Sequence, residues 1–527
     1  MQESFVEAQR PGYSKRWLGL VFIGISVVVI SLDNTVLNTA LPSISRHLNA
    51  TENDLQWIID SYALVFAALL LTTGSIGDRY GRKKALQFGL VWFMICSVLA
   101  ALVTSTTMLI ALRAVLGLGG AMILPATLSI ITATFPRSER PQAIALWAAI
   151  FGLGVGIGPV LGGFLLEHFD WNAVFLVNLP ICLIALVGGA LFLADSKDAH
   201  APNIDWPGIA LSIVGLFLFV HGIIDAGVHG WTDPVVLLPL VSGILVLAGF
   251  AWWESRSPNA MLPMRFFKNM SFSVASIALS LVTFCQFSLL FLLTPYLQTV
   301  HGYSTLQSGL GVLPLAITLT IMATVSARIS ARIGTKYTVS LGIAIAAIGY
   351  LFIAASYQVD TSYLVILIGQ VIVGIGVGAA FSPATNSIMS AVPIAKAGVG
   401  SAMNDTSRQL GGALGVAVLG TVLNLSYASS LNALKNPDMS ASVMAQSANS
   451  VQAAHQVADA LSSNLRQVLL TASNQAYVTG MDHALIVGAI VLAVAALFVT
   501  VFLPAQIRYY DEIAAQRAAQ VEFSTGD

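Results

Sequence analysis

Fourteen apolar segments, each long enough to cross a membrane as a helix, constrain the fold of this chain more than any other feature. A helix crosses about 30 Å of hydrocarbon in about 20 residues, and apolar segments of that length recur between residues 17 and 503. We place them at roughly 17–40, 57–77, 85–104, 107–132, 143–166, 174–194, 207–226, 234–252, 272–295, 306–327, 338–357, 363–386, 400–424 and 481–503. The pattern predicts an all-α membrane protein of about fourteen spans.

Composition excludes several classes of protein. Hydrophobic residues make up 56% of the chain, charged residues only 9%, and the mean hydropathy is +0.81, all outside the soluble globular range. A net charge of -1 argues against a nucleic-acid partner. The three cysteines, Cys96, Cys182 and Cys285, lie in apolar runs and form neither a disulfide framework nor a metal-ligand spacing. The first apolar run has no small-residue cleavage site, so we expect a retained span.

The distribution of Lys and Arg predicts the orientation in the membrane. If the N-terminus is cytoplasmic, 20 of these residues fall in cytoplasmic segments, and Arg113 lies inside a span. Only Arg46, Lys435 and Arg466 fall on the other side. The excess of basic residues in cytoplasmic loops therefore predicts that both termini are cytoplasmic.

The polar segments between the spans are short, and only 425–480 is long enough to form structure of its own. Its apolar residues at helical spacing suggest an external helix or hairpin, and a passive linker is the alternative. These residues are Val443, Val451, Val457, Leu461, Leu465 and Leu469. No phosphate-binding loop ending in Lys-Ser or Lys-Thr occurs, so we expect no ATP hydrolysis and no enzyme activity.

Two turns of similar sequence indicate an internal repeat. The turn at 74–84 is followed, eight spans later, by a similar but diverged turn at 326–336, which has Ala331 where the first has Asp78. The repeat predicts two six-helix halves with two inserted helices between them, and a substrate path between the halves. The expected division is 1–16 N-terminus, 17–194 first half, 207–252 inserted helices, 272–503 second half with external loop 425–480, and 504–527 C-tail.

Four motifs, in order, resemble those of a known family. The turn at 74–84 is similar to the signature of the major facilitator superfamily between spans 2 and 3. Residues 32–42, 113–117 and 154–163 resemble the signatures of spans 1, 4 and 5 in its fourteen-span drug/proton antiporters, the multidrug efflux transporters of the QacA and LfrA type. The resemblance covers nearly the whole chain and implies the major facilitator fold, in the cytoplasmic (inner) membrane of a bacterium.

The resemblance assigns roles to two of these motifs. In the turn at 74–84 it implies a conformational latch, in which Asp78 and Arg82 contact neighbouring helix ends, here the start of span 13. The latch residues are Asp78, Arg79, Gly81 and Arg82. In span 5 it implies an antiporter motif made of Gly154, Gly158, Pro159, Gly162 and Gly163. Glycines at every fourth residue line one helix face and allow a neighbouring helix to approach closely. Such a contact serves either as a seal or hinge between moving parts or as plain helix packing.

Charged residues within spans are costly and persist mainly where they function or are paired. Asp33 and Arg113 lie at matching depths below the outer face, which predicts a pair or a relay between them. Asp60 lies about one turn inside span 2, where an interfacial position is the alternative. Asp405 has Arg408 three residues away, and an intrahelical pair is its alternative. We expect proton coupling to involve Asp33, Asp60, Arg113 and Asp405.

A lipophilic pocket needs aromatic side chains, although each one is also typical of packing. We expect substrate binding by Asp33, Asp60, Tyr62, Phe66, Phe284, Phe287, Phe291 and Phe381, with Tyr296 a further aromatic candidate. His221 and Asp225, four apart in span 7, are weaker candidates because that span lies outside the repeat.

Together these features favour a proton-coupled antiporter that exports lipophilic, often cationic, compounds by alternating access. The expected partners are such substrates, protons and membrane lipids, with no nucleic acid, and we expect a monomer. The proton gradient takes the place of a cofactor, and no metal site is expected. The alternative is a lipid, siderophore or metabolite exporter on the same scaffold.

Overall fold

The computed structural model describes residues 13–504, apart from 49, 51, 137, 198–204, 258–259, 261–263, 394–396, 434–438 and 449. Within this part of the chain, fourteen helical segments are long and apolar enough to cross a membrane. The predicted number of spans and the all-α class are therefore confirmed. The physical reason is that lipid offers a backbone no hydrogen-bond partners, which leaves the helix as the form that satisfies them within the segment.

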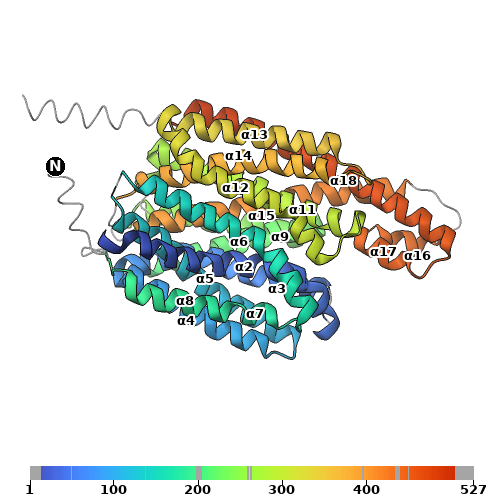
Figure 1. Cartoon of the computed structure of the whole chain (residues 1–527), viewed down its shortest axis with the longest axis horizontal. Coiled ribbons are helices and arrows are strands. Elements are labelled where there is room, and N and C mark those ends of the chain that lie inside the picture. The colour runs from blue at the N-terminus through green and yellow to red at the C-terminus, as the bar shows by residue number, and fades with distance from the viewer. Residues whose placement is uncertain are drawn as a thin grey trace, which may run out of the picture.

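Six spans form the first half of the molecule, and their helices lie together in Figure 1. Its helices are α2 (Arg16–Leu48), α3 (Glu52–Tyr80), α4 (Arg82–Ala101), α5 (Thr106–Thr134), α6 (Arg140–His168) and a last span made of α7 (Ala173–Leu176) and α8 (Asn178–Phe192). The inserted pair follows as α9 (Trp206–His229) and α10 (Pro234–Glu254).

Six further spans form the second half. They are α11 (Met270–Pro295), which continues into the π-helical turn η3 (Tyr296–Val300), then α12 (Thr305–Ile333), α13 (Thr335–Ser356), α14 (Tyr363–Ser390), α15 (Ala397–Asn432) and α18 (Ser463–Phe502). Between α15 and α18 lie two short helices, α16 (Ala441–Ser447) and α17 (Val451–Ala458). We call the end of the bundle that carries Arg16, Arg82 and Arg140 the basic end, and the end that carries α16 and α17 the hairpin end (Figure 1).

The two halves repeat one packing pattern. In the first half α2 packs on α6, α3 on α5 and α4 on α5, and in the second half α11 packs on α15, α12 on α14 and α13 on α14. The turns that the sequence matched also share a conformation, because Gly81 and Gly334 both have positive φ, 118° and 87°. Glycine is the residue that adopts this backbone region at little cost. Geometry thus agrees with the repeat read from the sequence.

Two seams join the halves. On one side α6 packs along α12, and on the other α3 packs on α15. The inserted helix α9 contacts both α3 and α15 and so covers the second seam, whereas α10 packs mainly on α9. The inserted pair therefore lies beside the seam rather than within either half.

Some helices are longer than the apolar segments from which they were predicted. Helix α2 runs on to Leu48 rather than ending near 40, and α18 begins at Ser463 rather than near 481. Hydropathy marks only the part of a helix that lipid surrounds, and these extensions are polar. Most of 425–480 is consequently helical, and α17 packs on α18 with Val451, Ala454 and Ala458 buried. The hairpin that the sequence suggested is present there.

Candidate functional site

A buried ion pair joins α2 to α5 inside the first half. The Nη1 of Arg113 donates to Oδ2 of Asp33 at 2.6 Å, and both residues are 3% exposed or less. Asn178 of α8 donates through Nδ2 to the other Asp33 oxygen at 3.2 Å and lies 3.3 Å from Oγ of Ser97 in α4. The pairing expected from matched depth is confirmed, and four helices hold the carboxylate in place.

The opposite side of Arg113 meets backbone and an aromatic ring of α3. Its Nε donates to the carbonyl oxygen of Ile58 at 3.1 Å, and its guanidinium carbon lies 4.4 Å from the centre of the Tyr62 ring. Phe66 stacks on Tyr62 with ring centres 5.5 Å apart. The Tyr62 hydroxyl is buried and has no hydrogen-bond partner among the described residues. Tyr62 and Phe66, both expected at the site, thus lie beside the ion pair.

We expect the Asp33–Arg113 pair to show strong energetic coupling. Removing one partner of a buried pair costs about 3–5 kcal/mol, because the other charge is left uncompensated. Asp33→Asn and Arg113→Gln should each lower the melting temperature in detergent, and the double variant should lose no more than either single one. The exposed pair Asp459–Arg466, 2.8 Å apart on the hairpin side, is the control, with coupling of about 0–1 kcal/mol. Simple addition of the two single effects at 33 and 113 would contradict the prediction.

A second buried ion pair lies within α15. Nη1 of Arg408 donates to Oδ1 of Asp405 at 3.1 Å, and Nδ2 of Asn404 lies 3.4 Å from the same oxygen. All three residues are 3% exposed or less. Arg408 is also surrounded by aromatic rings of two other helices, namely Trp147 and Phe151 of α6 and Phe381 of α14.

The sequence identified only part of this second group. Spacing along one helix pointed to Asp405 with Arg408, and Phe381 was an aromatic candidate. Trp147 and Phe151 were missed, although they are four residues apart and so share a helix face. Nothing in an apolar helix marks which face meets the other half of the molecule.

Asp78 ties the basic end of α3 to the first turn of α15. Both of its carboxylate oxygens accept from the backbone N–H of Gly398 at 2.9 Å, and Oδ2 accepts from that of Val399 at 3.4 Å. Arg82 donates to Asp78 through Nε at 2.8 Å. A helix N-terminus has unpaired N–H groups and partial positive charge, so a carboxylate is favoured there. The contact with span 13 that the resemblance implied is present, and its part in transport stays a prediction.

The two other residues assigned to the latch shape the turn. Gly81 has a φ of 118°, and a Cβ there would lie 2.7 Å from a carboxylate oxygen of Asp195, so a larger residue is strained and crowded. Arg79 lies with its guanidinium carbon 5.7 Å from the ring centre of Tyr80. Backbone contact is equally close nearby, since a Cβ on Gly74 would lie 2.5 Å from the carbonyl oxygen of Gly398.

Loss of Asp78 should open the basic end. Charge-assisted hydrogen bonds contribute about 1.5–3 kcal/mol each, so Asp78→Ala should shift the ratio of closed to open forms by at least about tenfold. A cysteine at Ala402, which packs beside Gly74, should then react faster with a maleimide in a background lacking the native cysteines. Asp233 is the control, because it caps α10 through Val235 N–H at 2.8 Å but lies outside both seams. Equal labelling rates with and without Asp78 would show that it does not hold this end closed.

Glycines of α6 allow two neighbours to approach, one on each side. A Cβ on Gly154, Gly158 or Gly162 would overlap Ser31, Thr35 or Thr39 of α2. The motif's regular spacing thus serves packing within the first half.

The intervening small residues of α6 face the second half. A Cβ on Gly156 would overlap Ala316 of α12, and one on Gly163 would lie 3.0 Å from the Cα of Leu306. Gly309 of α12 comes equally close to Pro159, because its Cβ would be 2.9 Å from that residue's carbonyl carbon. Gly156, Gly163 and Pro159, rather than Gly154, Gly158 and Gly162, therefore make the close contact between the halves.

The remaining predicted residues lie elsewhere. Phe287 and Phe291 lie against Gly412 and Gly420 of α15, and the backbone of Phe284 lies against Gly415, so this group packs two helices of one half together. Asp60 belongs to α3, but its side chain lies outside the described residues.

The weaker candidates in the inserted span form a partly exposed pair. Nε2 of His221 is 3.6 Å from Oδ2 of Asp225, and the His221 ring is 5.4 Å from that of Trp57. Within the described part of the chain, no group of three His, Cys, Asp or Glu side chains could hold a metal ion.

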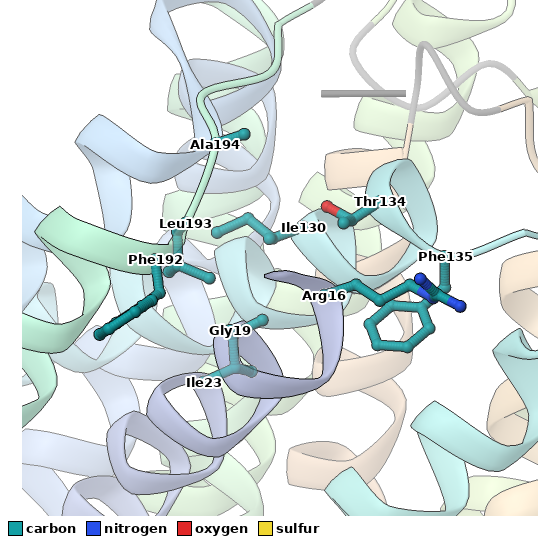
Figure 2. Close-up of a pocket in the computed structure, with 9 residues that line it drawn as sticks. All are labelled: Arg16, Gly19, Ile23, Ile130, Thr134, Phe135, Phe192, Leu193 and Ala194. Atoms are coloured by element: carbon teal, nitrogen blue, oxygen red, sulfur yellow. The ribbon is translucent and has the colours of Figure 1, made fainter. Parts of the chain in front are cut away.

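Figure 2 shows a crevice at the basic end, between the ends of α2, α5 and α8. Its lining residues are Arg16, Gly19, Ile23, Ile130, Thr134, Phe135, Phe192, Leu193 and Ala194. Arg16 forms two hydrogen bonds with Glu139, 2.7 and 2.9 Å long, which hold the pKa of Glu139 below its usual value. The crevice volume of about 10 Å³ holds about one water molecule, so this is no site for a drug-sized compound.

Comparisons with known proteins agree with this arrangement. Residues 23–416 match the family model of the Major Facilitator Superfamily. The chain is 33% identical over 491 residues to the multidrug efflux pump LfrA of Mycolicibacterium smegmatis, covering 93% of this chain and 96% of the relative. It is 32% identical over 408 residues to the tetracenomycin C resistance and export protein of Streptomyces glaucescens, covering 77% and 76%.

Among solved structures, a bacterial homologue of the human lysosomal transporter Spinster matches with a TM-score of 0.59 and 18% identity. That match covers 93% of this chain and 97% of the other. At this identity the likeness concerns the fold.

Proposed function

This chain belongs to the Major Facilitator Superfamily, and on that premise we propose that it exports lipophilic, often cationic, compounds in exchange for protons. It is a multi-pass membrane transporter rather than an enzyme, and its curated relatives are drug export proteins. To this class of transporter the proposal adds the coupling ion, the route of the substrate through the protein and the residues that take part. It places the basic end in the cytoplasm, because 19 of the 24 Lys and Arg residues lie in segments on that side when Arg408, which is buried within α15, is left out.

The observation that best supports proton coupling is the buried Asp33–Arg113 ion pair. Charged side chains buried within the membrane, such as this acid of α2 and this base of α5, are costly to keep, and such residues mark proton or substrate pathways. Asp33 has one oxygen on Arg113 and one on Asn178, so a proton arriving at the carboxylate weakens a contact between α2 and α5. Protonation at Asp33, with Asp60 or Asp405, either competes with substrate or drives the conformational change.

Alternating access follows from the two seams. The Asp78 contacts with Gly398 and Val399 close the basic end between α3 and α15. Release of that contact lets the halves part toward the cytoplasm, where substrate enters from the cytosol or the inner leaflet. The protein works as a monomer, and the proton gradient rather than a cofactor supplies the free energy, about 2.3 kcal/mol per proton for each 100 mV.

Transport by the purified protein in proteoliposomes tests this function. An imposed pH gradient should drive tetraphenylphosphonium and ethidium across the membrane, and a proton ionophore should stop the flux. Flux that ignores the gradient would remove the antiporter mechanism. Movement of a lipid or siderophore without any lipophilic cation would instead favour the alternative exporter on the same scaffold.

A further inference from the structure

The guanidinium of Arg408 is held by rings more than by hydrogen bonds. Its carbon lies 3.8 Å from the ring centre of Phe151, 5.3 Å from that of Phe381 and 5.4 Å from that of Trp147. Within the described part of the chain its side chain makes one hydrogen bond, from Nη1 to Oδ1 of Asp405. Aromatic faces attract cations, and the attraction is strongest where water is absent, as around this residue, which is 3% exposed.

The three rings also support one another. Phe151 stacks on Trp147 with centres 6.2 Å apart and on Phe381 with centres 6.5 Å apart. The indole Nε1 of Trp147 donates to Oγ1 of Thr127 at 3.0 Å, which fixes the direction of that ring. The rings are therefore positioned independently of Arg408. We call Trp147, Phe151 and Phe381 the aromatic cage.

The cage lies at the boundary between the halves and close to the middle of the membrane. Two of its rings belong to α6 of the first half and one to α14 of the second. Arg408 and Phe151 are each eleven residues from the start of their helices at the basic end, which is about 17 Å at 1.5 Å per residue. Phe381 is nine residues from that end of α14, or about 14 Å. Separation of the halves at the basic end would split the cage.

Hydrogen bonding around Arg408 is incomplete. Its Nε, Oδ2 of Asp405 and Oδ1 of Asn404 are buried and have no hydrogen-bond partner among the described residues. Arg113, in the other pair, has both a carbonyl and a carboxylate on its nitrogens. Buried polar groups are normally satisfied, so unpaired atoms beside a cation indicate a place that a ligand or water completes.

We propose that the aromatic cage, with Asp405 as counter-ion, binds the cationic part of the exported compound, and that Arg408 is a tethered cation that occupies the cage when it is empty. This inference rests on the proposed export of lipophilic cations and names the site and its chemistry. A flat or rounded lipophilic cation without hydrogen-bond donors fits three ring faces and one carboxylate. Arg408 swings aside as substrate enters, and its return helps to expel the substrate on the other side.

Two ions of the same shape and opposite charge test the inference. Tetraphenylphosphonium is the cation and tetraphenylborate the anion, and binding of each to the detergent-purified full chain is measured by isothermal titration. Arg408→Met keeps an apolar stem but removes the competing charge. We expect tetraphenylphosphonium to bind on the order of tenfold more tightly, the size of a desolvated cation–ring attraction, and tetraphenylborate to bind more weakly.

Two further comparisons identify the cage as the site. In the Arg408→Met background, Phe151→Leu should remove the gain, whereas Phe164→Leu, on the exposed side of α6, should keep it. Arg408→Lys keeps a charge but lacks the flat face that stacks on rings, so its affinity for the cation should lie between wild type and Arg408→Met. This variant also decides the question if Arg408→Met does not fold.

The outcomes separate this inference from the proposed function. If wild-type protein transports tetraphenylphosphonium but neither Arg408 variant binds it more tightly, or if Phe151→Leu leaves the gain intact, the cage is not the cation site. Weaker binding of tetraphenylborate without any gain for the cation would mean that Arg408 itself recognises an anionic substrate. Absence of wild-type cation transport in proteoliposomes would overturn the export function itself.

Discussion

Asp33→Asn is expected to abolish gradient-driven efflux while the protein still reaches the membrane. The amide keeps the shape of the carboxylate but has one acceptor oxygen instead of two, so it can accept from Arg113 or from Asn178 but not from both, and it cannot take up and release a proton. A gradient equivalent to 100 mV supplies about 2.3 kcal/mol per proton, or roughly a 50-fold concentration ratio for one uncharged substrate per proton. The ratio reached by the variant should fall to about 1, as measured with a fluorescent substrate in proteoliposomes.

A matched control keeps this result interpretable. Asp225→Asn also neutralises an acid within a span, but Asp225 belongs to the inserted helix α9 and pairs only with His221 within the described part of the chain. We expect it to transport at close to the wild-type level. Wild-type accumulation by Asp33→Asn would refute the coupling role, and equal loss in both variants would show that any lost acid in a span has this effect.

Gly158→Leu is expected to lower the melting temperature strongly and to stop transport. A Cβ alone at this position would overlap Oγ1 of Thr35 and come within 3.3 Å of the backbone nitrogen of Val36. Overpacking in a tight contact costs about 1–3 kcal/mol or more, and here α2, which carries Asp33, must move to make room. Detergent melting and proteoliposome flux measure the two effects.

Substitutions at two neighbouring positions of the same helix distinguish packing within the first half from contact between the two halves. Ile157→Leu changes a residue that is 39% exposed and should leave both measurements unchanged. Gly156→Leu, directed at Ala316 of α12, should reduce transport while leaving the α2–α6 contact intact. Unchanged melting and coupled transport in Gly158→Leu would mean that α2 and α6 do not pack as closely as the structure places them.

Several features of the site could be predicted because they depend on distances along one helix. Residues three or four apart share a helix face, which was enough to pair Asp405 with Arg408 and to align Gly154, Gly158 and Gly162. Depth below the membrane surface follows from 1.5 Å of rise per residue. That rule placed Asp33 and Arg113 at one level, although 80 positions separate them in the chain.

The partners of those faces could not be predicted in the same way. For the span 5 motif the sequence left a seal or hinge and plain helix packing both open. In the structure Gly154, Gly158 and Gly162 pack on α2, whereas Gly163 and Pro159 of the motif, with Gly156, meet α12. Phe287 and Phe291 lie against glycines of α15, a contact that the sequence did not indicate, and their expected role in substrate binding stays a prediction. Trp147 and Phe151 carried no signal at all, yet they surround Arg408.

The sequence by itself determined what the bilayer enforces, namely the number of spans, the helical backbone within each and the rarity of charge inside. It also determined the repeat of two six-helix halves, through the similar turns at 74–84 and 326–336. Which side of each helix meets its neighbours was decided only by the tertiary structure. In water a buried face is marked by apolar residues at helical spacing. In a membrane, lipid is as apolar as a protein core, so a span is apolar all round and its periodicity does not distinguish the lipid-facing side from the side that packs.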